Sequence, residues 1–331
     1  RFGAGRVVAE ALRRIDPAVV SRYPEVSPET LLKPALLARF RPAGVGAGQL
    51  FLGHGSFNLI ERVIHKLLQA DGMLGVGPQF TEVPSEFQEA GGAYEAFPLD
   101  ENGYRLPLAR LEAALSGRPV SLVYVDNPSN PLGLVHGRDE LERLARACER
   151  RGAVLLIDEA WGDYLDDAES AIHMVARHTN VAVVRSFSKA LGLAGERVGY
   201  MFLAEPLARY YRQVDIPFEP SVVGATLARA VLDEPGLLPE IRSEAARAKA
   251  WIAAAFTSAG MTVLPTHPGV AIMAVESPSG DVVGDLRRRG VKVLPGSSFT
   301  RTHPGWDDSR CRVRVVERDL VEPLCERIAG R

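Results

Sequence analysis

The chain has 331 residues with a formal net charge of −2, and 46% of them are hydrophobic against 24% charged. This composition is typical of a globular protein of about two domains with an ordinary core, and it excludes a disordered chain. Acidic and basic residues are interspersed and no apolar run approaches the roughly 18 residues that span a bilayer, which argues against nucleic-acid and membrane partners. Three scattered cysteines exclude a disulfide framework or a zinc cluster and favour a cytoplasmic location.

Short apolar runs alternate with amphipathic segments between residues 50 and 205. This alternation predicts an α/β fold with a mostly parallel, doubly wound sheet whose two faces are covered by helices. A helix is predicted over Asp139–Arg151, since its apolar residues recur every three to four positions, and Gly152 is placed to cap its end. The clearest predicted strands are Ser121–Val125, Ala153–Asp158, Val181–Ser186 and Arg197–Leu203.

The order of predicted elements changes after Pro220, where two long helices are followed by short strands. The helices are predicted over Ser221–Glu234 and Glu240–Gly260, and a third lies within Gly280–Gly290. The strands are predicted within Met261–Leu264, Val270–Glu276, Val291–Gly296 and Cys311–Val316. We therefore predict a large domain of residues 20–235 and a smaller α+β domain formed by residues 1–19 and 236–331.

Polar side chains follow three of the predicted strands of the large domain. They are Asn127, Asn130, Asp158, Ser186, Ser188 and Lys189. Because open α/β sheets bind ligands at the carboxyl ends of their strands, we expect these side chains to share one site. Lys189 follows a buried apolar run and precedes a glycine-rich segment, which favours a role in that site over a solvated surface position.

Five motifs occur in a characteristic order: RYPE (22–25), NPSNPLG (127–133), IDEAWGDY (157–164), SFSKALGLAGERVGY (186–200) and PGSSF (295–299). Together they resemble the motifs of fold-type I pyridoxal-phosphate (PLP) enzymes, specifically the histidinol-phosphate-aminotransferase-like proteins of aminotransferase class I/II. The resemblance covers nearly the whole chain. It implies an enzyme that uses PLP to move an amino group between an L-amino acid and a 2-oxo acid.

The resemblance also assigns roles around the cofactor. It implies that Lys189 holds PLP as a Schiff base and, once displaced by the substrate, carries a proton between the substrate Cα and the cofactor's C4′ atom. Such a lysine must be partly deprotonated near neutral pH, which burial and the nearby Arg197 favour. Asp158 would pair with the pyridine nitrogen and keep it protonated, and Asn130 would hydrogen-bond the 3′-oxygen of the ring.

The cofactor's phosphate requires hydrogen-bond donors, and the resemblance supplies candidates for them. Arg197 offers a fork of N–H groups, and two serine hydroxyls lie nearby in sequence. A glycine turn opens a predicted helix in GHGSFNLIERVIHKLL (53–68), so its first backbone N–H groups would cradle an anion. The implied phosphate-binding residues of this chain are Gly55, Ser56, Phe57, Ser186, Ser188 and Arg197.

Three further positions match residues that contact the cofactor or the substrate in the family. Phe80 would stack on the cofactor ring. Arg312 would grip the substrate α-carboxylate, although Arg314 points the same way along the predicted strand, so the choice between them depends on register. Tyr23 would reach the phosphate of the partner subunit across the interface of a homodimer.

The chain departs from the family pattern at several points. Trp161 stands where a tyrosine is usual, and its indole N–H donates from a different position, which alters the tuning of the cofactor. Phe57 and Asn58 replace an acidic pair that is common after the glycine turn. In the family a segment with an NENP-type motif precedes the part that begins here at Arg1, so we expect residues that read the substrate side chain to lie outside this sequence.

Other functions remain to be weighed against an aminotransferase. A decarboxylase, a lyase or a cyclase of the same fold would share Lys189 and Asp158, so these residues cannot separate the reactions. A degenerate binding protein would have lost Lys189, Asp158 or Arg197, and all three are present. A nicotinamide dehydrogenase would need G-x-G-x-x-G, and GHGSFN and similar stretches lack the third glycine. The seven histidines form no metal-binding spacing, so no metal is expected.

Overall fold

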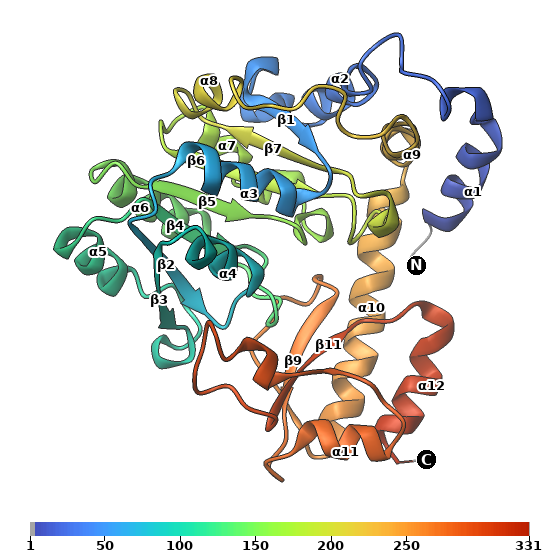
Figure 1. The fold of residues 1–331 in the computed structure, drawn as a ribbon. Helices are drawn as coiled ribbons and strands as arrows, with labels where there is room; N and C mark the ends of the chain where they lie inside the picture. The colour runs from blue at the N-terminus through green and yellow to red at the C-terminus, as the bar shows by residue number, and fades with distance from the viewer. Residues whose placement is uncertain (1–3, 331) are drawn as a thin grey trace.

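The computed structural model describes residues 4–330, and its centre is a seven-stranded sheet (Figure 1). The strand order is β1–β7–β6–β5–β4–β2–β3. Strands β2 to β6 run parallel to one another, and β7 runs antiparallel to its neighbours β1 and β6. The predicted mostly parallel sheet is therefore confirmed. The strands are β1 (Leu50–Gly53), β2 (Gly72–Gly77), β3 (Ala93–Pro98), β4 (Leu122–Asp126), β5 (Val154–Asp158), β6 (Val181–Ser186) and β7 (Gly199–Leu203).

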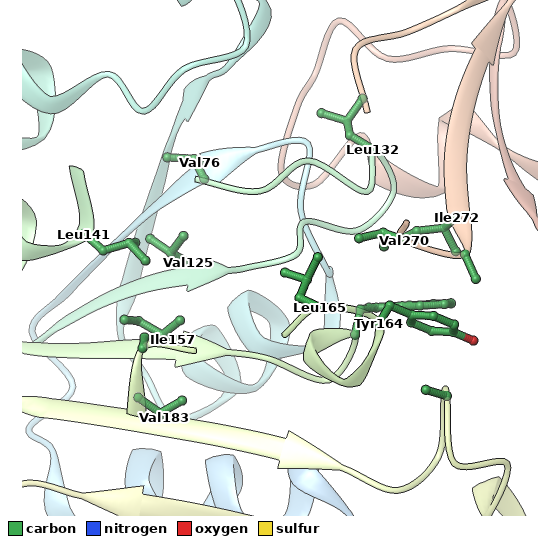
Figure 2. Packing of buried hydrophobic residues seen from close by; sticks show 14 of the residues in the cluster. Val76, Val125, Leu132, Leu141, Ile157, Tyr164, Leu165, Val183, Val270 and Ile272 are labelled. Atoms are coloured by element: carbon green, nitrogen blue, oxygen red, sulfur yellow. The ribbon is translucent and has the colours of Figure 1, made fainter. Parts of the chain in front are cut away.

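The sheet is buried on both faces because the side chains of each central strand alternate between two apolar clusters. In β4, Val123 and Val125 belong to one cluster, whereas Leu122 and Tyr124 belong to the other. Figure 2 shows Val125 of β4 near Val76 of β2 and Ile157 of β5, which belong to the same cluster. The first face is covered by α2 (Glu29–Arg39), α5 (Leu108–Gly117), α6 (Arg138–Glu149) and α7 (Ile172–Val175), and the second by α3 (Ser56–Leu67), α4 (Glu82–Glu89) and α8 (Leu207–Tyr211).

A second sheet of four antiparallel strands, in the order β10–β11–β9–β8, is formed by the C-terminal part of the chain. The long helix α10 runs from the large sheet to this smaller unit (Figure 1). The elements are α10 (Leu237–Ser258), β8 (Thr262–Val263), β9 (Ile272–Glu276), α11 (Val282–Arg288), β10 (Leu294–Pro295), β11 (Arg310–Arg314) and α12 (Arg318–Ile328).

The first helix, α1 (Ala4–Arg14), packs against α9 (Val222–Asp233), and Arg6 forms an ion pair with Glu234 just beyond it. The division into domains at residues 20 and 235 stays a prediction. Among the helices within residues 4–330, none combines the length and the apolar content that crossing a membrane requires.

Most predicted element positions agree with the structure to within a few residues, and the exceptions have local causes. The last strand of the large sheet begins at Gly199 instead of Arg197, because Arg197 adopts a left-handed backbone conformation with φ 54° that interrupts the extended chain. Gly152 has φ +69° after α6, as a helix-capping glycine does. The short strands β8 and β10 are only two residues long, so pairing with their longer neighbours defines them.

The smaller unit is anchored to the turn that follows β4. Lys249 of α10 is 3% exposed, and its Nζ lies within hydrogen-bonding distance, 2.6–2.8 Å, of Thr266 Oγ1 and of the carbonyl oxygens of His267, Val270 and Ile272, which share its N–H groups. In the same loop the His267 N–H donates to the carbonyl of Gly133, 2.9 Å away. A Cβ at Gly133 would lie 2.5 Å from the Ile272 carbonyl oxygen, so glycine permits this close approach. The loop thus holds the segment that carries Asn130.

Candidate active site

A cavity of about 690 Å³, including the part that opens to solvent, lies where β4, β5 and β6 end. The position agrees with the ligand-binding edge of an open α/β sheet. Its walls are formed by Ser56, Phe57, Phe80, Asp126, Pro128, Asn130, Asp158, Ala160, Trp161, Ser186, Ser188, Lys189, Ala194 and Arg197. The structure therefore brings together most of the residues that the motifs singled out.

Asp158 ends β5 and is 5% exposed. Its Oδ1 accepts a hydrogen bond from the Ala160 N–H at 2.8 Å, and its Oδ2 accepts one from the Tyr124 hydroxyl at 3.2 Å. Burial raises the pKa of this carboxyl, while these two hydrogen bonds and the charge of Lys189 act in the opposite direction. A carboxylate in this setting is stabilised by a cationic partner in the cavity.

Lys189 lines the cavity, and its side chain as a whole is exposed to solvent, whereas the amine is partly desolvated by the surrounding protein. Burial lowers the pKa of the amine, and the guanidinium groups of Arg312, Arg197 and Arg314 lower it further, whereas Asp158 raises it. The Nζ atom lies 5.4 Å from the centre of the Trp161 ring, which in turn stacks on Tyr164 with ring centres 5.8 Å apart. The direction of the pKa shift matches the expectation, although the Lys189 side chain is more exposed than the motif predicted.

The end of the cavity near α3 has the character of an anion cradle. Arg197 Nη1 donates to Ser188 Oγ at 3.3 Å and to the Ala194 carbonyl at 3.1 Å. Gly55 precedes the first turn of α3 with φ +84°, and a Cβ there would lie 2.6 Å from Arg197 Nη2. Because the first N–H groups of a helix lack intrahelical partners, Ser56 and Phe57 present donors to the same space as the guanidinium.

Arg312 approaches the site from the smaller unit. It lies on β11 opposite Ala274 of β9, and its Nη1 donates to Asn130 Oδ1 at 3.0 Å. Burial lowers the pKa of this guanidinium, and its Nε is buried without a partner among the described residues. Arg314, two residues on, is exposed. Of the two arginines, Arg312 is therefore the one in direct contact with a residue of the cavity wall.

The remaining predicted features lie as follows. Phe57 packs edge-on against Phe80 with ring centres 6.3 Å apart, and Asn58 accepts a hydrogen bond from Arg62 at 2.6 Å. The two residues that replace the acidic pair therefore serve packing and an internal hydrogen bond. Tyr23 is 92% exposed and does not line the cavity of its own chain. Within residues 4–330 no group of three or more His, Cys, Asp or Glu side chains is arranged to hold a metal ion.

Two residues of the site were missed by the sequence interpretation. Asp126 ends β4 and lines the cavity, and its position directly before Asn127 in the quoted turn was a usable signal. Tyr124 lies inside β4, where the sequence pattern predicts only a core aromatic residue. The pairing of β4 with β5 brings its hydroxyl to Asp158.

Comparisons with known proteins show the family and the fold of the chain. The family model described as aminotransferase class I and II matches residues 7–328. A histidinol-phosphate aminotransferase of Shouchella clausii is 29% identical over 85% of this chain and 75% of its own length. Histidinol-phosphate aminotransferase 2 of Pseudomonas aeruginosa is 31% identical over 90% of this chain and 79% of its own length.

Solved structures share the fold. The histidinol-phosphate aminotransferase of Sinorhizobium meliloti, solved in complex with pyridoxal-5′-phosphate, has a TM-score of 0.82 at 22% identity and covers 99% of this chain and 88% of its own. The L-threonine-O-3-phosphate decarboxylase of Porphyromonas gingivalis has a TM-score of 0.77 at 17% identity, with coverage of 99% and 94%. The fold is thus shared by aminotransferases and by a decarboxylase. By its sequence, the chain belongs to aminotransferase class I and II.

Proposed function

We propose that this protein is a PLP-dependent aminotransferase that moves an amino group between an L-amino acid and a 2-oxo acid. The observation that carries the proposal is the convergence of a lysine amine, a buried carboxyl and an anion cradle on one cavity. The family membership supports the reaction class, and the relative solved with pyridoxal-5′-phosphate supports the cofactor.

The residues of the cavity fit PLP by their chemistry. Asp158 is a buried carboxyl, and a protonated pyridine nitrogen is the cation that would stabilise its charged form. Arg197 and the N-terminus of α3 supply donors suited to a phosphate. Asn130 uses its side-chain oxygen to accept from Arg312, which leaves its amide N–H groups to donate to the ring oxygen, and Phe80 offers a flat apolar surface to the ring.

Lys189 performs the proton transfers. When bound, PLP supplies the electron sink that stabilises negative charge at the substrate Cα. Lys189 would hold the cofactor covalently through Nζ until an amino acid displaces it. The freed amine would then accept the Cα proton and return it at C4′, and burial, which lowers the pKa of the amine, favours the neutral form that this role needs.

Arg312 is proposed to bind the substrate carboxylate, and Arg314 provides a matched control on the same strand. We expect Arg312→Gln to raise KM for the amino acid by about 10- to 100-fold, because a charge-assisted bidentate contact is lost. Arg314→Gln should raise it by less than about 3-fold, since an exposed charge is screened by solvent. Steady-state kinetics with one amino donor would measure both, and an equal effect in the two variants would contradict the assignment.

The reaction class is tested by absorbance spectroscopy. The protein is loaded with PLP, then mixed in turn with a panel of L-amino acids and 2-oxo acids. We expect one amino acid to bleach the visible cofactor band and one 2-oxo acid to restore it. Release of carbon dioxide or ammonia without such restoration would instead indicate the decarboxylase, lyase or cyclase alternative, and the absence of any cofactor band would refute the proposal.

The subunit arrangement is a further part of the proposal. Val20, Tyr23 and Val26 lie in one segment before α2 and are 63–92% exposed, as residues covered by a second copy of the chain would be. Tyr23 then reaches the phosphate of the partner's site, and sedimentation velocity would reveal the homodimer.

We place the enzyme in the cytoplasm, in keeping with the free thiols of Cys148, Cys311 and Cys325.

A further inference from the structure

Asp126 is a second carboxyl in the wall of the cavity. It ends β4 directly beside Asp158 of β5, and the two residues are paired in the register of the sheet. Asp126 is 3% exposed and lines the cavity. Burying a carboxyl costs free energy unless hydrogen bonds to the protein or to a ligand compensate for the lost water. The hydrogen bonds of Asp126 therefore indicate its role.

One oxygen of Asp126 joins two separate loops. Its Oδ2 accepts a hydrogen bond from the backbone N–H of Asn130 at 2.8 Å and another from the backbone N–H of Phe80 at 3.1 Å. Phe80 follows β2, whereas Asn130 belongs to the turn after β4, and both side chains line the cavity. The carboxyl therefore sets the distance between the two loops whose side chains would contact the cofactor ring.

The other oxygen, Oδ1, is buried and has no hydrogen-bond partner among residues 4–330. Burial raises the pKa of Asp126 to about 8, with the neighbouring Asp158 adding to the rise and the two backbone N–H donors opposing it. These contributions favour the protonated, neutral form, whose Oδ2 can still accept both hydrogen bonds. An asparagine at this position has the same shape, the same neutrality and the same acceptor oxygen.

We propose that Asp126 is a positioning residue of the cofactor site, which holds Phe80 and Asn130 at their working separation through the two backbone hydrogen bonds to Oδ2. The inference rests on the proposed function, because it assumes that these two side chains contact PLP. It assigns Asp126 no contact with the reacting atoms. The acceptor oxygen is required, and the negative charge is not.

The test compares variants that keep the acceptor with variants that remove it. Asp126→Asn keeps an oxygen in place of Oδ2. Asp126→Leu keeps the branching and the number of heavy atoms of the side chain, Asp126→Ala removes them, and both lack an acceptor. Ser129→Ala is the matched control, because Ser129 Oγ accepts from the Leu134 N–H at 3.1 Å within the same turn and does not hold the backbone N–H of Phe80 or Asn130, which Asp126 Oδ2 accepts. The cofactor-free proteins are first compared by thermal melting to establish that each is folded.

Each folded protein is then titrated with PLP, and the dissociation constant and the circular dichroism of the visible cofactor band are recorded. We expect Asp126→Leu and Asp126→Ala to raise Kd for PLP by about 5- to 100-fold, the loss expected for two hydrogen bonds, and to weaken the induced dichroism. Asp126→Asn and Ser129→Ala should stay within about 3-fold of the wild type and retain the dichroic signal.

Three outcomes are decisive. If the leucine and alanine variants bind PLP as the wild type does, the two hydrogen bonds do not position the site and the inference is wrong. If Asp126→Asn weakens PLP binding well beyond about 3-fold relative to the wild type, the charge matters and the inference is also wrong, and this comparison with the wild type stands even if the acceptor-free variants do not fold. If the wild type itself gives no cofactor band, the proposed function fails, which is distinguishable from both.

Discussion

Replacing Lys189 by alanine is expected to lower the rate of transamination by about 10²- to 10⁴-fold, the usual contribution of a positioned acid–base group. The same change should abolish the visible band of covalently bound PLP, while the phosphate cradle around Arg197 still binds the cofactor. The reason is that the Lys189 amine, with its lowered pKa, is proposed both to bind the cofactor and to carry the Cα proton. No other lysine lines the cavity as the structure describes it.

The measurement pairs a spectrum with single-turnover kinetics in the presence of one active amino acid. Lys292→Ala is the matched control, since Lys292 is exposed and lies in the smaller unit, and it should behave as the wild type. A Lys189→Ala protein that keeps the covalent band would show that another amine holds the cofactor.

Replacing Asp158 by asparagine is expected to lower the rate by about 10²- to 10³-fold, the effect of removing one preorganised electrostatic contact. The asparagine keeps the size of the side chain and an acceptor for the Tyr124 hydroxyl but cannot balance a protonated pyridine nitrogen. The covalent band should still form, because Lys189 is untouched. Full activity in this variant would contradict the proposed pairing.

The pH dependence of PLP affinity distinguishes this role from simple packing. Burial raises the pKa of Asp158, so its carboxylate is lost at a higher pH than that of a surface aspartate as the solution is acidified. Affinity of the wild type for PLP should therefore fall on the acid side of neutrality, and that fall should be absent in Asp158→Asn. Asp139→Asn, an exposed substitution in α6, should leave the acid fall unchanged.

Local sequence was sufficient for the strands and for the residues at their ends. The apolar runs before Asp158 and Lys189 form β5 and β6, because near-continuous apolar residues suit strands that are buried on both faces. The carboxyl ends of parallel strands meet at one edge of a sheet, so residues separated by about 30 positions in the chain could be expected to share a cavity, and they do. The roles of these residues, the domain boundaries and the contact of Tyr23 with a partner remain predictions.

By itself, the sequence determined the family, the doubly wound sheet and most of the cavity wall, because each depends on short-range patterns and on motif order. Only the tertiary structure decided that Arg312 contacts Asn130 across 182 residues of sequence, and that Lys189 lies over the Trp161 ring. It likewise decided that Asp126 joins the loops of Phe80 and Asn130. These contacts depend on strand pairing and on how the smaller unit packs against the large sheet, and neither is encoded in any local run of residues.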